Sequence, residues 1–363
     1  ADNAATTRID PDVVQAMMPA FGELYGNPST IYSKGREARE AVDQAREQVA
    51  KAINCRPNEV YFTSCGTESD NWAIRGVAKR YAAKKGKHII TTNIEHHAVL
   101  ETLKAMEKEG FEVTYLPVNE EGFITAEQVK QAIRPDTVLI TVMTANNEIG
   151  SIQPIEEISA VAKEHGVLFH TDAVQAVGHI PVDVQKMGVD LLSLSGHKFH
   201  APKGVGALYV RRGILPDNLM NGGGQERSRR PGTENIAGIL GLGAAIEKAT
   251  ATLERDMEYV ASLRDRLIDG IVSTIPYCKV NTPSHHRLPG TVNVSIKYIE
   301  GESMLLLLDM NGICATSGSA CASGDLDPSH VLLAIGLPHE IAHGSVRFSF
   351  CADNTVEEID YIL

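Results

Sequence analysis

The sequence predicts an α/β protein with a large domain built on a mostly parallel seven-stranded sheet, and a smaller α+β domain. Within residues 59–212, seven short runs of apolar, mostly β-branched residues alternate with segments of amphipathic helical pattern. This alternation is typical of parallel strands that are covered by helices on both faces. Beyond residue 212 the pattern changes to a long helical stretch and further strands, and 363 residues are enough for two domains.

The predicted strands of the large domain follow one another along the chain, and a helix is expected after each of the first four. These helical segments carry apolar residues on one face, which allows them to pack against a sheet. Ligands of such folds bind beyond the carboxyl ends of the strands, so a site is expected there. The strands are predicted at 59–64, 87–93, 112–118, 137–144, 167–172, 190–195 and 206–212.

The smaller domain is predicted from the last part of the chain. A helical stretch over 234–274 is expected to break near Gly238, Gly241 and Gly243, because glycine weakens a helix interior. The part around 250–270 is the expected connector between domains, and two strands, "TVNVSIK" and "SVRFSF", flank the helix "EGESMLLLLDMNG". We therefore expect residues 15–255 to form the large domain, and residues 1–14 with 256–363 to form the small one.

Composition and charge narrow the class of protein. The chain has 34 basic and 46 acidic residues, a net charge of -12, which argues against nucleic acid as the main ligand. The local basic run "ERSRRPG" (226–232) has a solvated loop as its simplest interpretation. No stretch of 18 uncharged apolar residues predicts a membrane span, and no CxxC pair predicts a zinc finger. The N-terminus lacks the features of a signal peptide, so we expect a cytoplasmic protein with free thiols.

Three predicted strand ends carry polar residues. The first is "FTSCGTESDN", where Gly66 and Thr67 open a helix whose free N–H groups could hold a phosphate. The alternative is that Thr67, Ser69 or Asp70 only caps the helix. The second strand end carries Asp172, with Gln175 three residues later, and the third leads to Lys198 in "SGHKFHAPKGVGALYV".

Taken together, these strand ends match the needs of pyridoxal phosphate. Its aldehyde needs an amine such as Lys198 to form an imine, and its pyridine nitrogen needs a carboxylate such as Asp172 to stay protonated. The phosphate needs hydrogen-bond donors such as those near Gly66. A structural alternative for Asp172 alone is a helix N-cap.

Ordered motifs over essentially the whole chain resemble the cysteine desulfurases of the NifS/IscS group, which belong to the class-V aminotransferases. This resemblance implies the aspartate-aminotransferase-like, fold-type-I fold of pyridoxal-phosphate-dependent transferases. The segments that carry it are "DNAATT" (2–7), "YGNPST" (25–30), "FTSCGTESDN" (62–71), "EHHAVL" (95–100), "ANNEIG" (145–150), "HTDAVQAVG" (170–178), "SGHKFHAPKGVGALY" (195–209), "GGGQERSRRPGTEN" (222–235), "YIEGESMLLLLD" (298–309), "SGSACASG" (317–324) and "HGSVRFS" (343–349).

The resemblance implies roles around the cofactor ring. Lys198 is the expected Schiff-base lysine, Asp172 the partner of the pyridine nitrogen, and Gln175 the donor to the ring hydroxyl. His96 is expected to stack on the ring and to help move protons, whereas His97 is interpreted as structural. A metal site built from these adjacent histidines is not expected, because their side chains point in different directions on a helix.

The resemblance also implies the remaining ligands of the cofactor and the substrate. Four residues of this chain are expected to hold the phosphate, together with Thr233 from across a dimer interface, so that the basic run 227–230 becomes an ordered interface loop. Arg347 is expected to bind the substrate carboxylate, because a guanidinium offers it two parallel hydrogen bonds. Asn147 is expected near the ring oxygen and that carboxylate. The four phosphate ligands are Gly66, Thr67, Ser195 and His197.

Cys321 in "ATSGSACASG" matches the sulfur-accepting nucleophile of the family. Its neighbours are small residues that suit an exposed loop, and a reactive thiol needs access. Cys314 in the apolar run "GICAT" is interpreted as a packing residue instead. The chain departs from the family pattern at Tyr32, Ala322 and Cys351, and none of these changes removes a catalytic group.

The implied reaction converts L-cysteine to L-alanine and leaves sulfur as a persulfide on Cys321, from which it passes to an iron–sulfur scaffold protein or another acceptor. A cytoplasmic homodimer is expected. Alternatives are a selenocysteine lyase, another pyridoxal-phosphate lyase or aminotransferase of the same fold, and a catalytically silent interaction scaffold.

Overall fold

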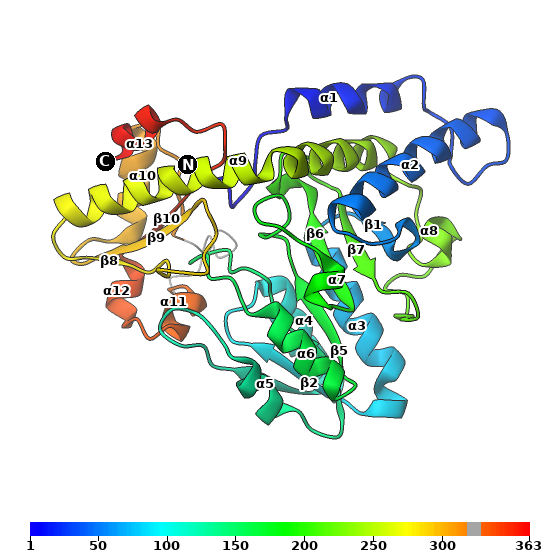
Figure 1. Ribbon diagram of the computed structural model, residues 1–363, viewed down its shortest axis with the longest axis horizontal. Coiled ribbons are helices and arrows are strands. Elements are labelled where there is room, and N and C mark those ends of the chain that lie inside the picture. Colours follow the sequence, from blue (N-terminus) through cyan, green and yellow to red (C-terminus); the bar gives the residue numbers. More distant parts are fainter. Residues whose placement is uncertain (318–327) are drawn as a thin grey trace.

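A seven-stranded sheet forms the centre of the larger part of the molecule (Figure 1). The computed structural model describes residues 1–317 and 328–363. The strand order is β1-β7-β6-β5-β4-β2-β3, in which β7 runs antiparallel to both of its neighbours and the other pairs are parallel. The predicted mostly parallel sheet is therefore confirmed. Its strands are β1 (Val60–Thr63), β2 (His88–Thr92), β3 (Glu112–Leu116), β4 (Thr137–Thr141), β5 (Leu168–Asp172), β6 (Leu191–Ser195) and β7 (Gly206–Val210).

Helices cover both faces of this sheet, because crossovers between parallel strands place them there. On one face α3 (Gly66–Lys85) and α4 (His97–Lys108) enclose a core around Trp72 and Leu103. On the other face α2 (Ser33–Ala52), α6 (Ile155–Glu164) and α9 (Ile236–Thr274) bury a second core. Both cores consist of apolar side chains, so the polar residues at the strand ends are not part of them and are available for a binding site. Shorter helices are α1 (Pro11–Met17), α5 (Ala126–Ala132), α7 (Val184–Met187) and α8 (Gln225–Ser228).

A second sheet lies at the other end of the molecule (Figure 1). It is antiparallel, in the order β10-β9-β8, and the last part of α9 packs on it through Leu263 and Leu267. The predicted strands at β9 and β10 are present, whereas the short edge strand β8 was not predicted. The elements are β8 (Cys278–Val280), β9 (Thr291–Ile296), α10 (Gly301–Met310), α11 (His330–Ala334), α12 (His339–His343), β10 (Ser345–Ser349) and α13 (Val356–Ile362). The domain limits at 14/15 and 255/256 stay a prediction.

Helix α9 is continuous over 39 residues, so the predicted break near its glycines is wrong. The glycines serve close packing instead. A Cβ on Gly243 would lie 2.9 Å from the Cα of Ala45 in α2, and one on Gly241 would lie 2.8 Å from the sulfur of Met17. By length and hydropathy alone α9 could cross a membrane, but that is weak evidence because the core helix of a globular protein passes the same test. Here the helix packs against both sheets' cores.

Residues 1–10 connect the two sheets. The backbone N–H of Asn3 donates to the carbonyl of Ser349 at the end of β10, and that of Thr7 donates to the carbonyl of His197, next to Lys198. The N-terminal segment therefore lies between the small sheet and the carboxyl ends of β5 and β6.

Candidate functional site

Lys198, Asp172 and His96 lie together at the carboxyl edge of the large sheet. Asp172 ends β5, and Lys198 ends the 3-10 turn Gly196–Lys198 that follows the neighbouring strand β6. Burial raises the pKa of Asp172 and lowers that of His96, and the positive charge of Lys198 acts on both groups in the direction of a lower pKa. The structure thus brings together three residues that are far apart in the sequence.

The N-terminal segment holds the Lys198 amine. Lys198 Nζ donates to the carbonyl of Ala4 at 2.6 Å and to that of Ala5 at 2.9 Å. Gln175 Nε2 also donates to the Ala4 carbonyl, at 3.0 Å. Two predicted cofactor ligands therefore share one backbone acceptor. Sequence reasoning missed these acceptors, because a backbone carbonyl leaves no mark on residue type.

Asp172 is a buried carboxylate, 6% exposed. Its Oδ1 accepts a hydrogen bond of 2.9 Å from the N–H of Val174. Burial raises its pKa to about 6, and the Val174 N–H and the Lys198 charge act in the opposite direction. A carboxyl group in this setting is stabilised in its charged form by any cation that binds against it.

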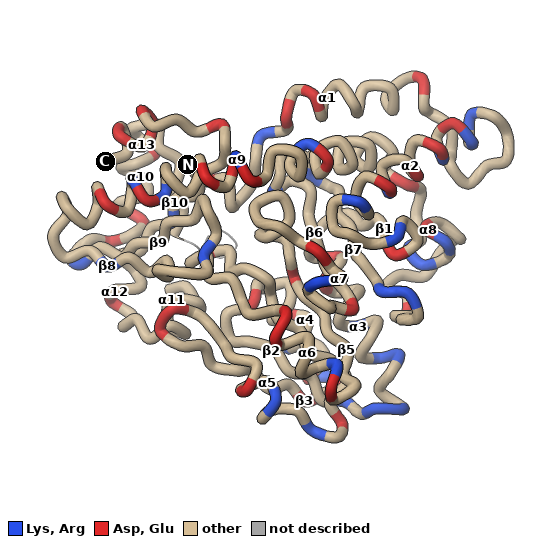
Figure 2. Tube along the Cα trace, in the orientation of Figure 1, with Lys and Arg blue, Asp and Glu red and all other residues tan. Residues whose placement is uncertain are grey.

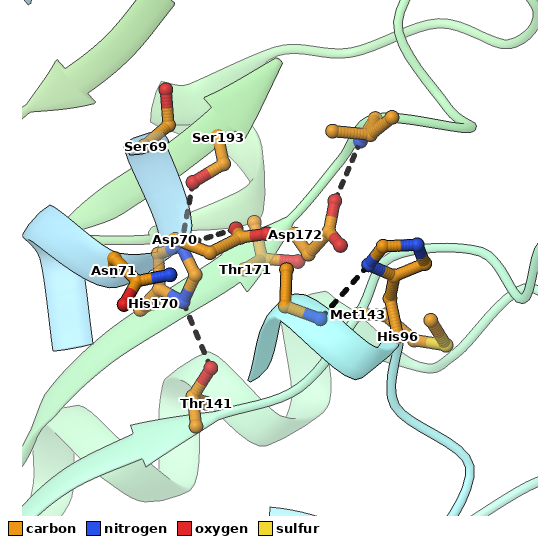
Figure 3. Close-up of polar contacts among 12 residues, drawn as sticks. Ser69, Asp70, Asn71, His96, Thr141, Met143, His170, Thr171, Asp172 and Ser193 are labelled. Atoms are coloured by element: carbon orange, nitrogen blue, oxygen red, sulfur yellow. Dashed lines mark hydrogen bonds and ion pairs between the residues drawn. The ribbon is translucent and has the colours of Figure 1, made fainter. Parts of the chain in front are cut away.

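A buried polar network lies beside Asp172, and Figure 3 shows its members. His170, fully buried on β5, contacts Thr141 Oγ1 through Nδ1 at 2.8 Å and Ser193 Oγ through Nε2 at 3.0 Å. Its Nε2 also lies 3.6 Å from Oδ1 of Asp70 in α3. Burial lowers the pKa of His170 to about 3, so the imidazole is neutral. Burial and then the Asp172 charge raise the pKa of Asp70 well above its usual value.

Sequence reasoning missed His170 and weighed Asp70 only as a cap. A signal for His170 was present in "HTD", because residues two apart in a strand face the same side, so His170 and Asp172 share a face. No sequence signal could have brought Asp70, on a helix, to that face.

His96 is the N-cap of α4, and its Nδ1 accepts a hydrogen bond of 3.1 Å from the N–H of Ala98. Burial, then the charges of Lys198 and of neighbouring histidines, lower its pKa to about 4. The neutral ring therefore carries its proton on Nε2, which is free to donate. The ring of His97 lies 5.0 Å, between centroids, from the ring of His330 at an interplanar angle of 58°, and His330 Nε2 donates to the carbonyl of Glu95.

Helix α3 begins at Gly66, and no side chain caps its first N–H groups. The predicted alternative of a cap by Thr67, Ser69 or Asp70 is wrong, since the N-cap is Cys65. A Cβ on Gly66 would lie 2.6 Å from Cγ2 of Val174, so only glycine fits this approach of helix and strand end. An uncapped helix N-terminus with this close approach is suited to a phosphate.

Of the other three predicted phosphate ligands, Ser195 lies at the start of α3, His197 contacts the N-terminal segment and Thr233 lies apart from both. Ser195 is buried, 3.4 Å from the same hypothetical Cβ on Gly66, which places it at the helix start. His197 contacts Thr6 Oγ1 through Nδ1 at 3.1 Å, and burial, then the charge of Lys198, lower its pKa to about 4. Thr233 is exposed, and no hydrogen bond in the described part of the chain joins it to these residues.

The basic run 227–230 is tied to the protein and is not a solvated loop. Arg230 pairs with Glu68 in the first turn of α3 at 2.7 Å, and Arg227 lies over the ring of Tyr61. Glu226 pairs with Arg46 of α2 at 2.7 Å, and both side chains are buried. The basic residues around α8, blue in Figure 2, therefore contact β1 and the start of α3, and Glu226 joins the loop to α2. A dimer contact of this loop stays a prediction.

Arg347 and Asn147 meet on the side of the small sheet. Arg347 is 2% exposed, and it donates through Nη1 to the Asn147 carbonyl at 2.7 Å and through Nη2 to Asp2 Oδ1 at 2.8 Å. Arg347 Nε and Asn147 Oδ1 are buried without a hydrogen-bond partner among the described residues. A buried polar atom without a hydrogen-bond partner destabilises the folded protein, so these two atoms are suited to hydrogen bonds with a polar ligand.

Cys321 and Ala322 lie outside the described residues. The chain leaves the described part beside Arg347, because Arg347 N donates to the Thr316 carbonyl and Thr316 N donates back at 3.3 Å. Tyr32 is an exposed residue at the N-cap of α2, away from these contacts.

The donor set fits pyridoxal phosphate. It comprises an amine, a buried carboxylate beside it, an uncapped helix N-terminus, and unpaired polar atoms on Asn147 and Arg347. These are an imine-forming group, a partner for a pyridinium, a phosphate site and a place for a carboxylate-bearing substrate.

Comparisons with known proteins agree with this arrangement. The family model described as "Aminotransferase class-V" matches residues 1–362. A cysteine desulfurase IscS of Clostridium botulinum is 57% identical and aligns over all of this chain and 91% of its own length. A cysteine desulfurase IscS of Methanosarcina thermophila is 55% identical, over all of this chain and 89% of its own.

Solved structures are similar as well. A structure titled "NifS-like protein" superposes with a TM-score of 0.93 at 41% identity, over 99% of this chain and 95% of its own. Another, titled "SspA in complex with cysteine", superposes with a TM-score of 0.86 at 38% identity, over 98% of this chain and 99% of its own.

Proposed function

Because the chain belongs to the class-V aminotransferase family, we propose that it is a pyridoxal-phosphate-dependent cysteine desulfurase. It converts L-cysteine to L-alanine and provides sulfur for iron–sulfur cluster assembly. The observation that carries this proposal is the meeting of Lys198, Asp172 and His96 at one edge of the sheet, in a chain 57% identical over its whole length to a cysteine desulfurase. The structure with bound cysteine, a 38% identical neighbour, supports L-cysteine as the substrate.

Pyridoxal phosphate, when bound, supplies an electron sink that makes the bonds at the substrate α-carbon and β-carbon labile. The chain supplies the binding groups. Asp172 would neutralise the protonated pyridine nitrogen, and Gln175 would donate to the ring oxygen. Gly66 and Thr67 at the start of α3 would hold the phosphate with Ser195 and His197. Asn147 and Arg347 bind the substrate carboxylate.

Lys198 and His96 act on protons. The Lys198 amine, which donates to two backbone carbonyls, would hold the cofactor aldehyde and would carry protons at the substrate. His96 uses Nδ1 to accept from the Ala98 N–H, which leaves its Nε2–H to donate, and its low pKa keeps the ring uncharged, so the ring would not repel Lys198.

Cys321 is the proposed sulfur acceptor. Its thiolate attacks the sulfur of the bound L-cysteine, an S–S bond forms, and the bond from sulfur to the β-carbon breaks with its electron pair left on carbon. That carbon takes up a proton, so L-cysteine and one thiol become L-alanine and one persulfide. The persulfide then passes to an acceptor protein.

The central experiment is to incubate the purified protein with L-cysteine and to measure alanine and a persulfide on the Cys321 peptide. Cys321→Ser is expected to keep the cofactor and lose alanine formation. The control Cys314→Ser keeps both, because Cys314 is exposed, so its interpretation as a packing residue is wrong. Full activity of Cys321→Ser would exclude the acceptor role. Comparison with selenocysteine separates the desulfurase from a selenocysteine lyase, and no colour change with either substrate would favour a silent scaffold.

A cytoplasmic location and a homodimer belong to the same proposal. The described cysteines are all free, which suits a reducing compartment. Thr233, exposed in this chain, reaches a phosphate only if a second copy places it there. The sulfur acceptor is an iron–sulfur scaffold protein in this proposal.

A further inference from the structure

His200, Cys351 and Asp353 form a cluster that the proposed reaction does not use. A nitrogen of His200, the sulfur of Cys351 and a carboxylate oxygen of Asp353 all lie within 4.8 Å of one another. All three residues line a cavity of about 260 Å³ that borders the cofactor site through Ala4 and Gln175 but does not include Lys198 or Asp172. The cavity therefore lies next to the reacting groups, not around them.

The His200 ring is already oriented for a ligand. Its Nδ1–H donates to the Arg8 carbonyl at 2.9 Å, which leaves the lone pair on Nε2 of the neutral ring. The backbone is fixed as well, because the N–H of His200 donates to Thr7 Oγ1 at 2.7 Å and its carbonyl accepts from Asp10. His200 keeps a left-handed backbone with φ of 67°, an unfavourable conformation for a residue other than glycine.

A short turn holds the other two residues. Cys351 N donates to Asn354 Oδ1 at 3.0 Å, and Asn354 N donates to the Cys351 carbonyl at 3.1 Å. Asn354 Oδ1 also accepts from Asn3, so the turn is joined to the N-terminal segment. The ligand atoms are therefore set by a closed turn on one side and a hydrogen-bonded loop on the other.

The positive side chains near the cluster are neutralised by carboxylates, so they do not oppose the binding of a cation. Two cations also line the cavity, Lys248 and Arg255, and each is paired: Lys248 with Asp10 at 2.8 Å and Arg255 with Asp256 at 2.8 Å. A divalent ion bound to one thiolate, one carboxylate and one neutral imidazole has no net charge, which suits a site with a buried sulfur.

We propose that His200, Cys351 and Asp353 bind a divalent transition metal ion of the zinc class. Nitrogen, thiolate and carboxylate ligands suit Zn²⁺, whereas Mg²⁺ and Ca²⁺ prefer oxygen alone. Three protein ligands leave a fourth position for water or a small ligand in the cavity. On binding, the Cys351 thiol gives up its proton to solvent, and no other bond changes.

Bound metal would join two segments of the chain, one with His200 and one with Cys351 and Asp353. His200 follows Lys198 by two residues, Arg8 belongs to the segment whose Ala4 and Ala5 carbonyls hold the Lys198 amine, and Cys351 follows β10 of the small sheet. The ion would stabilise the folded protein, because such a ligand set exists only when these segments are assembled.

The test uses the cofactor-loaded full chain after treatment with a chelator. Titration with Co²⁺ is expected to give a thiolate-to-cobalt charge-transfer band and the visible bands of a tetrahedral site, at one equivalent per chain. Zn²⁺ is expected to displace the Co²⁺ and to raise the unfolding temperature, while Mg²⁺ does neither. Absence of a thiolate band in the wild-type protein would overturn the proposal.

Variants assign the band to its residues. Cys351→Ser is expected to abolish it, and His200→Asn to weaken binding by more than about tenfold; asparagine also tolerates the left-handed backbone. Cys314→Ser and Cys321→Ser are controls that should titrate as wild type. Unchanged titration of Cys351→Ser would refute the site.

A readout on the wild-type protein does not depend on folding of the variants. Zn²⁺ is expected to slow alkylation of Cys351, measured by peptide mass spectrometry, and an unchanged alkylation rate would also refute the site. Alanine formation from L-cysteine is assayed separately, so failure of the metal site and failure of the desulfurase proposal are distinguishable.

Discussion

Arg347 and Asp172 are single buried charges with different partners. Arg347 has Asp2 and the Asn147 carbonyl, and its Nε remains unpaired among the described residues. Asp172 has one backbone N–H, the charge of Lys198 and the nearby Asp70. A ligand of opposite charge would therefore stabilise each of these buried charges, and the site favours ligands that carry such charges.

Arg347→Lys is expected to raise KM for L-cysteine by about tenfold to a hundredfold, because a hydrogen bond between charged groups contributes roughly 1.5–3 kcal/mol. The lysine keeps a charge toward Asp2 but loses the second parallel bond. Steady-state alanine release measures this, with Arg287→Lys, at a pair with Asp265, as control. A fall in kcat at constant KM would count against carboxylate binding.

His170 makes a pH-dependent contribution to stability. Its folded-state pKa of about 3 lies below the ordinary value of 6.5, so the unfolded chain binds a proton there that the folded protein does not. Its stabilisation is therefore present above about pH 6.5 and is lost as the pH falls toward 3, by up to about 1.4 kcal/mol per pH unit.

We expect His170→Gln to be less stable than wild type at about pH 7, and the difference to shrink as the pH falls to about 5. Burial raises the pKa values of Asp172 and Glu95 and gives them the opposite trend, but both residues are present in both proteins. Urea unfolding at each pH measures the difference. His286→Gln, at an exposed side chain, is the control, and a difference that stays constant with pH would contradict this account.

At the scale of elements, the site is formed by the carboxyl ends of strands and the N-termini of helices. β5 and β6 deliver Asp172 and Lys198 because neighbouring parallel strands end at the same edge. α3 delivers an uncapped N-terminus and α4 begins at His96. Helix α9 contributes no predicted site residue, but it packs under the large sheet through its glycines and against the small sheet through Leu263.

Gly243→Ala in α9 is expected to destabilise the protein by about 1–3 kcal/mol, because the new methyl group meets the backbone of Ala45 in α2. Alanine alone would favour the helix by roughly 1 kcal/mol. Gly270→Ala is the matched control, since its methyl group meets only the terminal Leu363 side chain. Chemical denaturation measures the stability of both variants. Equal losses of stability would mean that packing of α9 against α2 does not explain the glycine at position 243.

At the scale of the whole molecule, two sheets and the N-terminal segment converge on Lys198. Arg347 comes from the small sheet, Asp172 from the large one, and the acceptors of the Lys198 amine from Ala4 and Ala5. Thr233 is exposed, and no hydrogen bond in the described part of the chain joins it to the other predicted site residues. A second copy of the chain is the proposed reason.

Thr233→Ala is expected to bind pyridoxal phosphate more weakly, and Lys198→Ala to lose the covalent attachment and its visible absorption band. If Thr233 acts across a dimer, mixing the two variants under subunit exchange, at a cofactor concentration that leaves Thr233→Ala unloaded, restores part of the activity, because one site of each mixed dimer is intact. Lys203→Ala, at an exposed lysine, is the control for the band. Absence of restored activity in proven mixed dimers would place Thr233 outside the partner's site.

The seven strands, their mostly parallel arrangement and the residues at their ends were predictable from the sequence, because burial on both faces leaves an apolar signature and polar strand ends interrupt it. The family resemblance supplied the roles of Lys198, Asp172 and Cys321. What those patterns could not supply was the continuity of α9, since glycine is read as a helix breaker until the neighbour that needs its small size is known.

Only the tertiary structure placed Asp70 beside His170, the Ala4 and Ala5 carbonyls beside Lys198, and Cys351 beside His200. These contacts join residues that are remote in the chain, and each depends on how one element packs against another. Sequence determines which side chains are present and which local structures they favour. Long-range packing decides which of them share a buried space, and the pKa and the ligands of each follow from that space.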